Sequence, residues 1–243
     1  MEFLKFKLSG KTAFFKKPEV NSYYYFTFGN VHKVALLGIF GAVLGYAGYE
    51  KQKREETVYP EFYERLKEIR VGIMPAEERT KGCFPKKVQS FNNSVGYASR
   101  EQGGNLIVKQ QWLENPAWYV YVLVEGEESR KLAEAILQKQ CVYMPYLGSN
   151  DHPADLEQAE ILAGEERVPG TEERIDSFAP ARFLQLGEED DDILPYKYTE
   201  YLPVALTEET NLYQYEKFFY TNLPVENISC PVYRVDGKNI CIF

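Results

Sequence analysis

Residues 31–49, VHKVALLGIFGAVLGYAGY, decide how the rest of the chain can be interpreted. From Val34 to Tyr49 the stretch carries no charge, and its glycines recur at positions 38, 41, 45 and 48. On a helix this spacing places all the glycines in one stripe. Each glycine costs roughly 1 kcal/mol relative to alanine inside a helix. The stripe therefore predicts that another backbone, a sheet or a ligand lies close against a face without side chains.

The same run raises the question of a membrane span, because Gly41 and Gly45 form a GxxxG motif. However, the uncharged run is about four residues shorter than the roughly 20 residues that cross a bilayer. A window of bilayer length must include Lys33 or Glu50. We therefore favour a buried helix in a soluble protein and keep a membrane-associated scaffold as an alternative. His32 and Lys33 would then lie in the first turn of the helix, where backbone N–H groups favour an anion.

Charge is unevenly distributed along the chain. Residues 1–140 contain 21 Lys and Arg against 16 Asp and Glu, whereas residues 141–243 contain 7 against 20. This asymmetry predicts a basic working surface joined to an acidic region. The four cysteines form no CxxC pair, and the sequence suggests no signal peptide. We therefore expect reduced thiols in a cytoplasmic protein, without a metal site and without a cofactor.

Two stretches have a composition that suits RNA. Residues 11–30, KTAFFKKPEVNSYYYFTFGN, interleave lysines with phenylalanines and tyrosines. Single-stranded nucleic acid requires this combination, since phosphates attract charge and unstacked bases stack on flat rings. Residues 76–116 resemble an irregular hairpin, and within them residues 81–109 contain five cations and Glu101 as the one acid. A long loop of this kind in a folded domain is usually functional or disordered.

Alternating and helical patterns predict the fold class. Strand patterns occur at residues 2–8, 70–74 and 118–125, a further strand is expected within 155–168, and helical patterns occur at 34–49 and 127–140. With residues 76–116 taken as an insertion, the order is the βαββαβ plan of a ferredoxin-like fold, whose sheet is a stacking platform in RNA-recognition domains. We predict an α+β protein with one domain at 1–168 and a small β-rich extension at 169–243. The extension contains a solvated acidic run at 188–192 and a closing hairpin that turns at Asp236-Gly237.

Four segments carry a resemblance to a known family. They are FKLSGKTAFFKKPEVNSYYYFTFGNVHKVALLGIFGAVLGY at 6–46, FNNSVGYASREQGGNLIVKQQWLENP at 91–116, YMPYLGSND at 143–151 and YRVDGKNICIF at 233–243. Together they resemble the CRISPR-associated subunit that caps the 5′ end of the guide RNA in type I interference complexes (Cascade). This is the fifth Cas family of the RAMP superfamily, and the likeness is greatest to its type I-B branch.

The resemblance implies a fold and a function. Members look like a modified ferredoxin-like (RRM-like) domain with a long β-hairpin thumb, which would correspond to residues 76–116 here. They are non-catalytic and grip the 5′ handle of the crRNA. They also pack against the neighbouring backbone subunit and the large subunit of Cascade, so target DNA would be reached only through the complex and no membrane would be involved. In such complexes base pairing supplies sequence specificity.

The resemblance also implies a set of RNA-binding residues. Cations would contact phosphates, asparagines would read base edges, and a glycine would let the backbone approach closely. The handle would be contacted by Lys16, Lys17, His32 and Lys33; the thumb would use Lys86, Lys87, Asn92, Asn93, Tyr97 and Arg100; Tyr146 and Gly148 would shape the loop after the second helix; Tyr23 and Lys109 complete the set.

One branch of the same family, from type I-C systems, resembles these proteins but cuts the repeat RNA. Cleavage without metal needs a base near the 2′-OH and an acid or cation at the leaving oxygen. The Lys-His pair of that branch is not visible, because Lys109 is followed by two glutamines. A metal-independent endoribonuclease remains an alternative, with His32, Lys33 and one of residues 23–25 as its candidate site. We assign no catalytic residue.

Overall fold

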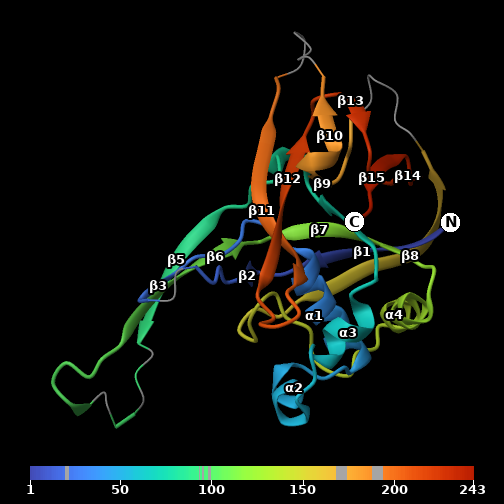
Figure 1. Ribbon diagram of the computed structural model, residues 1–243. Coiled ribbons are helices and arrows are strands. Elements are labelled where there is room, and N and C mark those ends of the chain that lie inside the picture. Colours follow the sequence, from blue (N-terminus) through green and yellow to red (C-terminus); the bar gives the residue numbers. More distant parts are fainter. Residues whose placement is uncertain (20–21, 93, 95, 98–99, 168–173, 188–193) are drawn as a thin grey trace.

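Six antiparallel strands form the central sheet of the computed structural model (Figure 1). Their order is β15 (Lys238–Cys241), β14 (Val232–Val235), β8 (Asp155–Glu166), β1 (Glu2–Ser9), β7 (Ala117–Leu123) and β4 (Val71–Pro75). The structure describes residues 1–19, 22–92, 94, 96–97, 100–167, 174–187 and 194–243. Asn93 and the acidic run at 188–192 lie outside the described residues. The strands predicted at 2–8, 70–74, 118–125 and 155–168 are confirmed as β1, β4, β7 and β8.

Helices cover one face of this sheet. They are α1 (Lys33–Leu44), α3 (Glu61–Leu66) and α4 (Glu127–Leu137), while the short α2 (Tyr49–Glu55) buries none of its residues. Alternation along β1 points Leu4, Phe6 and Leu8 toward the helices, and all three are fully buried. The hydrophobic contact between alternate strand residues and the helical faces forms the main core.

The glycine-rich stretch does not form one long helix, so the prediction of a four-glycine stripe was wrong. α1 ends at Leu44 because Gly45 adopts a left-handed φ of 80°, and Gly48 precedes α2. Only Gly38 and Gly41 remain on α1, where Gly41 packs against Phe62 of α3. Within the described residues, no helix is both long and apolar enough to cross a membrane.

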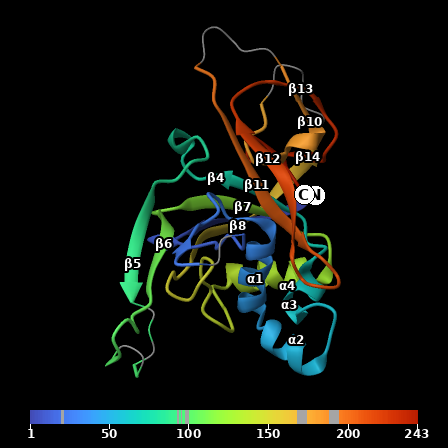
Figure 2. The same ribbon diagram turned by 60° about the vertical axis from the view of Figure 1, so that its left-hand side comes forward.

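Between β4 and β7 the chain forms a projecting hairpin, which we call the arm (residues 86–114). It consists of β5 (Lys86–Asn92) and β6 (Ile107–Glu114), paired from Lys86↔Leu113 to Asn92↔Ile107. Two short strands, β2 (Thr12–Ala13) and β3 (Tyr24–Tyr25), pair with the other edge of β6. Figures 1 and 2 show the arm extending well away from the sheet and helices.

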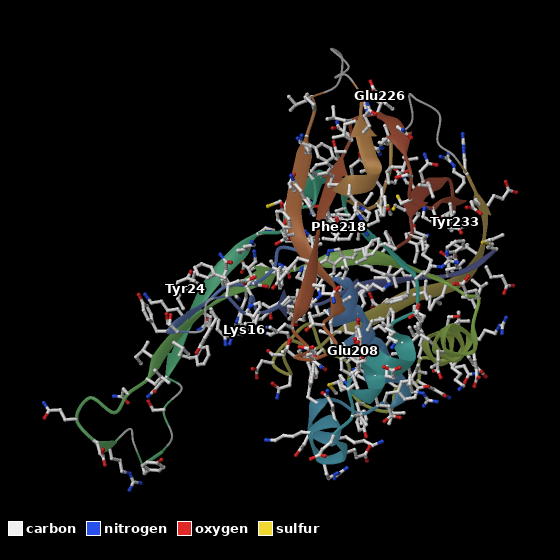
Figure 3. All side chains as sticks on the ribbon, viewed as in Figure 1. Lys16, Tyr24, Glu208, Phe218, Glu226 and Tyr233 are labelled. Atoms are coloured by element: carbon white, nitrogen blue, oxygen red, sulfur yellow. The ribbon has the colours of Figure 1, made fainter. Side chains whose placement is uncertain are left out.

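The C-terminal third is rich in strands and packs on both sides of the sheet. Its longest feature is the hairpin of β11 (Lys197–Leu206) and β12 (Tyr213–Thr221); the shorter strands are β9 (Ala179–Pro180), β10 (Leu184–Leu186) and β13 (Val225–Ile228). Leu202 and Phe218 of the long hairpin belong to the same core as α1. Figure 3 labels Phe218 on this hairpin. This third is therefore integrated into the main core.

The last two strands form one edge of the sheet, and their side chains also pack over the sheet face opposite the helices. β14 and β15 turn at Asp236-Gly237, where both residues have the positive φ that a two-residue hairpin turn requires. Their side chains join Phe3, Tyr121 and Leu123 of the sheet in a second buried cluster; its other members are Tyr233, Val235, Ile240 and Ile242. At these positions the face of the sheet is therefore covered by the C-terminal hairpin and is not open for bases to stack on it.

Candidate nucleic-acid interface

A groove of about 780 Å³ runs along the outward side of α1, and we call it the α1 groove. Small residues of α1 form its floor, namely Ala35, Gly38 and Ala42, whose spacing places them on one side of the helix. An added Cβ at Gly38 would meet nothing within 4 Å. The glycine thus leaves space in the groove, whereas Gly41 on another side of α1 makes room for α3. A close approach of a ligand to Gly38 stays a prediction.

Aromatic and basic side chains surround this floor. Tyr46, Tyr49, Tyr143, Met144, Tyr146 and Tyr213 line the groove together with Lys16, Lys51 and Arg54. Met144 is 75% exposed, and the rings of Tyr143 and Tyr146 are also exposed. Lys51 is paired with Glu61 at 3.0 Å, so part of its charge is compensated. Flat exposed rings beside cations are the combination that holds unpaired nucleotides.

The loop at 143–148 is fixed by backbone contacts. Tyr143 donates its backbone N–H to the Ala42 carbonyl oxygen at 2.9 Å, and Phe14 donates to the Leu147 carbonyl oxygen at 3.0 Å. Gly148 has a φ of +90°, and a Cβ there would overlap the carbonyl group of Phe14. Only glycine can adopt this positive φ without strain and also leave room for the Phe14 carbonyl group. The loop therefore presents its rings to the groove from a fixed position.

His32 lines the groove at the start of α1, but its ring stabilises the fold. It caps α1, since its Nδ1 accepts the Ala35 N–H at 3.2 Å. The rings of Phe15, Phe28 and Tyr213 surround it. Burial lowers the pKa of His32 from 6.5 to about 3, so the imidazole is neutral at physiological pH. A direct RNA contact by His32 stays a prediction.

The three lysines predicted at the handle lie in different places. Lys16 lines the α1 groove, with its Nζ 4.5 Å from the ring centroid of Tyr25. Lys17 faces a second pocket, where its Nζ lies 3.7 Å from the Glu200 carboxylate. Lys33 is half-buried at the start of α1 and does not line the α1 groove. Burial lowers its pKa, which its neighbour Glu68 partly offsets.

The residues predicted on the arm are mostly exposed. Tyr97 is 78% exposed, and Lys86, Arg100 and Lys109 also reach solvent. Lys109 donates its backbone N–H to the Tyr23 carbonyl oxygen at 2.7 Å, which brings these two predicted residues together.

Two other predicted arm residues have partners within the arm. Lys87 lies 3.7 Å from Glu114 and 5.7 Å from the Trp112 ring. Asn92 donates to Asn105 at 3.1 Å. Lys87 and Asn92 therefore help to hold the hairpin together. Contacts of the exposed arm cations with phosphates stay a prediction.

The predicted residues thus form two groups joined by one segment. Lys16, Tyr146 and Gly148 line the α1 groove, while Lys86, Tyr97, Arg100 and Lys109 follow the arm. Residues 14–28 connect the groups, since Lys16 pairs with Thr27 and β3 pairs with β6; Figure 3 shows Lys16 near the foot of the arm and Tyr24 farther out. Sequence reasoning missed Tyr143, Met144, Lys51 and Arg54. The apolar and aromatic run VYMPY at 142–146 was the available sequence signal for the first two.

Comparisons with known proteins identify the fold. No family model and no curated protein matches the sequence. A chain of a structure described as a CRISPR RNA-guided surveillance complex superimposes with a TM-score of 0.52 at 14% identity, over 93% of this chain and 91% of that chain. A CRISPR protein from Archaeoglobus fulgidus superimposes with a TM-score of 0.53 at 11% identity, over 100% and 99%. This mixed α/β chain therefore shares its fold with CRISPR-associated proteins.

Proposed function

We propose that this chain is the non-catalytic subunit of a type I-B-like CRISPR interference complex that binds the 5′ handle of the crRNA. The observation that carries the proposal is the α1 groove, which combines Gly38 on its floor with exposed aromatic rings and Lys16. Residues 14–28 connect this groove to the exposed basic arm. The full-length superposition on CRISPR-associated proteins supports a role in a CRISPR effector complex.

The strand order supports a ferredoxin-like core of the RAMP type. In chain order the elements are β1, α1, β4, β7, α4 and β8, and the strands lie as β8-β1-β7-β4. This matches the βαββαβ plan, with the arm inserted between its second and third strands as a thumb. In this interpretation residues 1–168 form the RNA-binding domain and residues 169–243 extend it.

The two groups of residues would divide the work of RNA binding. In the α1 groove, Tyr143 and Tyr146 offer faces on which unpaired bases stack, while Gly38 lets a sugar-phosphate chain lie close to the helix. On the arm, Lys86 and Lys109 offer charge to phosphates. Such contacts hold RNA mainly by shape and charge, so a guide could vary in sequence outside the handle.

We propose that the chain binds the RNA without cutting it. The neutral His32 ring is buried, and its Nδ1 is used to cap α1. His152 is also buried, and burial lowers its pKa. An imidazole with a pKa of about 3, as in His32, is a poor general acid or base near neutral pH. Within the complex, the neighbouring backbone subunit and the large subunit would be the protein partners.

The test is binding and cleavage of labelled repeat RNA without added metal, by the purified chain alone and with its neighbouring operon products. We expect retention without cutting. A Tyr143→Ala/Tyr146→Ala variant should bind about tenfold or more weakly, since each stacked base contributes roughly 1–3 kcal/mol. Tyr201→Ala is the matched control, because Tyr201 is an exposed tyrosine outside the groove.

Two outcomes would contradict this proposal. Specific cutting that disappears in His32→Ala would make the chain a processing endoribonuclease. An absence of RNA retention in every combination of subunits would remove both functions.

A further inference from the structure

Two cysteines that are eleven residues apart in the sequence meet in the fold. Cys230 lies between β13 and β14, and Cys241 is the last residue of β15. Their Sγ atoms are 2.8 Å apart. This is about 0.8 Å more than the S–S bond length of roughly 2.04 Å. Both thiols are free, and neither takes part in the RNA-binding surface proposed above.

The surroundings hold the two thiols in this position. Cys241 donates its backbone N–H to Ser177 Oγ at 2.9 Å and pairs with Val232 across the hairpin. Ile242 donates its backbone N–H to the Pro231 carbonyl oxygen at 3.1 Å, which fixes the residue next to each cysteine. Small movements of two side chains are therefore sufficient to join the sulfurs.

We propose that Cys230 and Cys241 form an oxidation site that yields an intramolecular disulfide with a small-molecule disulfide as the oxidant. The Cys230 thiolate attacks one sulfur of the oxidant, forms a mixed disulfide and releases the first small thiol. Cys241 then attacks the Cys230 sulfur and releases the second small thiol. The two protein thiols lose two electrons and two protons, and the oxidant gains them as two thiols.

Exposure and hydrogen bonding set the order of attack. Cys230 is 8% exposed and Cys241 is fully buried, so a small oxidant reaches Cys230 first. The hydrogen bond from the Cys241 thiol lowers the pKa of Cys230, while the same contact and burial raise the pKa of Cys241. A thiolate is the attacking species in disulfide exchange, which favours Cys230 as the first nucleophile.

The disulfide would close a loop that contains the hairpin of β14 and β15. This hairpin covers Phe3, Tyr121 and Leu123 of the sheet. Oxidation would therefore hold this hairpin in place over the sheet. It would not change the α1 groove or the arm. The proposal does not rest on the proposed RNA function and applies to the chain by itself.

The experiment uses the full chain with the exposed Cys83 and Cys141 replaced by serine, so that only the pair remains. The folded protein is treated with oxidised glutathione, and its intact mass and its non-reduced peptide map are measured. We expect the loss of two hydrogen atoms, no retained glutathione and a linked Cys230–Cys241 peptide. The Tm should rise by roughly 5–10 °C and return to its starting value with dithiothreitol.

Several outcomes would overturn the proposal. Glutathione held stably on Cys230, two thiols that remain alkylatable after treatment, or a disulfide without a rise in Tm would each do so. Cys230→Ser and Cys241→Ser should show neither the mass change nor the Tm shift. If either serine variant fails to fold, the mass and peptide map of the Cys230/Cys241 protein still decide the question.

Discussion

At the scale of single residues, the two glycines of α1 have opposite roles. Gly38 faces the groove, whereas a Cβ at Gly41 would clash with Phe62. Their sequence contexts are similar, so the difference arises from tertiary packing alone. The fold requires a glycine at position 41, whereas a ligand in the groove would require one at position 38. Substitutions at the two positions can therefore be compared directly.

We expect Gly38→Ala to raise the free energy of unfolding by about 0.5–1 kcal/mol, because alanine is the better helix former and has space there. Gly41→Ala should lower it by about 1–3 kcal/mol, because α3 must move. Urea unfolding measures both. If Gly38 serves RNA, its alanine variant should also bind repeat RNA more weakly despite the gain in stability. Equal effects of the two substitutions on stability would contradict this interpretation.

His32 makes stability depend on pH. The ordinary pKa of 6.5 applies in the unfolded chain, whereas burial lowers the folded value to about 3. The unfolded chain therefore binds the extra proton first, so the stabilisation is complete above pH 6.5 and is lost as the pH falls toward 3. At pH 5 the loss from this residue amounts to about 2 kcal/mol.

The measurement is urea unfolding at pH 7 and pH 5, with His32→Asn as the comparison. Asparagine is a good N-cap and does not titrate, so it should flatten the pH dependence. His152 titrates in the same direction, because burial lowers its pKa too, so some dependence should persist. An unchanged slope in His32→Asn would show that His32 is not the titrating group.

At the scale of elements, the arm carries exposed cations on two paired strands. Lys86 and Lys109 are exposed on β5 and β6. We expect the double variant Lys86→Ala/Lys109→Ala to bind RNA more weakly. The plot of the logarithm of the binding constant against the logarithm of the salt concentration should also become less steep, by about 0.7 for each lost phosphate contact with single-stranded RNA.

The matched control is Arg130→Ala/Lys131→Ala, which removes two exposed cations from α4. Fluorescence anisotropy at a series of salt concentrations would separate the two variants. If both variants reduced the salt dependence of binding equally, RNA binding would depend on the overall charge and not on the arm.

The success of sequence reasoning also varied by element. Alternation identified β1 and β7 because each strand has apolar residues that face the helices, and this pattern is local. The end of α1 was missed, because Gly45 adopts a left-handed φ and packs closely against Val142, which lies far along the chain. The groove wall at 143–148 was recognised only in part, since its position depends on the backbone of Phe14 and Ala42.

At the scale of the whole molecule, the C-terminal third shares cores with the first part. Ile240 of β15 is fully buried against the sheet, whereas Ile161 of β8 is 41% exposed. We expect Ile240→Ala to lower the free energy of unfolding by about 2–5 kcal/mol, and Ile161→Ala to lower it by less than about 1 kcal/mol.

We further expect Ile240→Ala and Leu132→Ala, a buried change on α4, to shift one common unfolding transition. Near-ultraviolet circular dichroism and hydrogen exchange measure this. Two separate transitions, only one of which responds to Ile240→Ala, would show that residues 169–243 unfold independently.

The placement of β1 in the middle of the sheet has a consequence for biosynthesis. Phe3 pairs with Leu123 on one side and with Leu162 on the other, so the first strand must wait for partners made much later. Until both have left the ribosome, its apolar side chains remain exposed to other chains and to chaperones. Pairings this distant in sequence also form slowly. A larger supply of chaperones during synthesis should therefore increase the yield of folded protein, because it protects the first strand until its partners have been made.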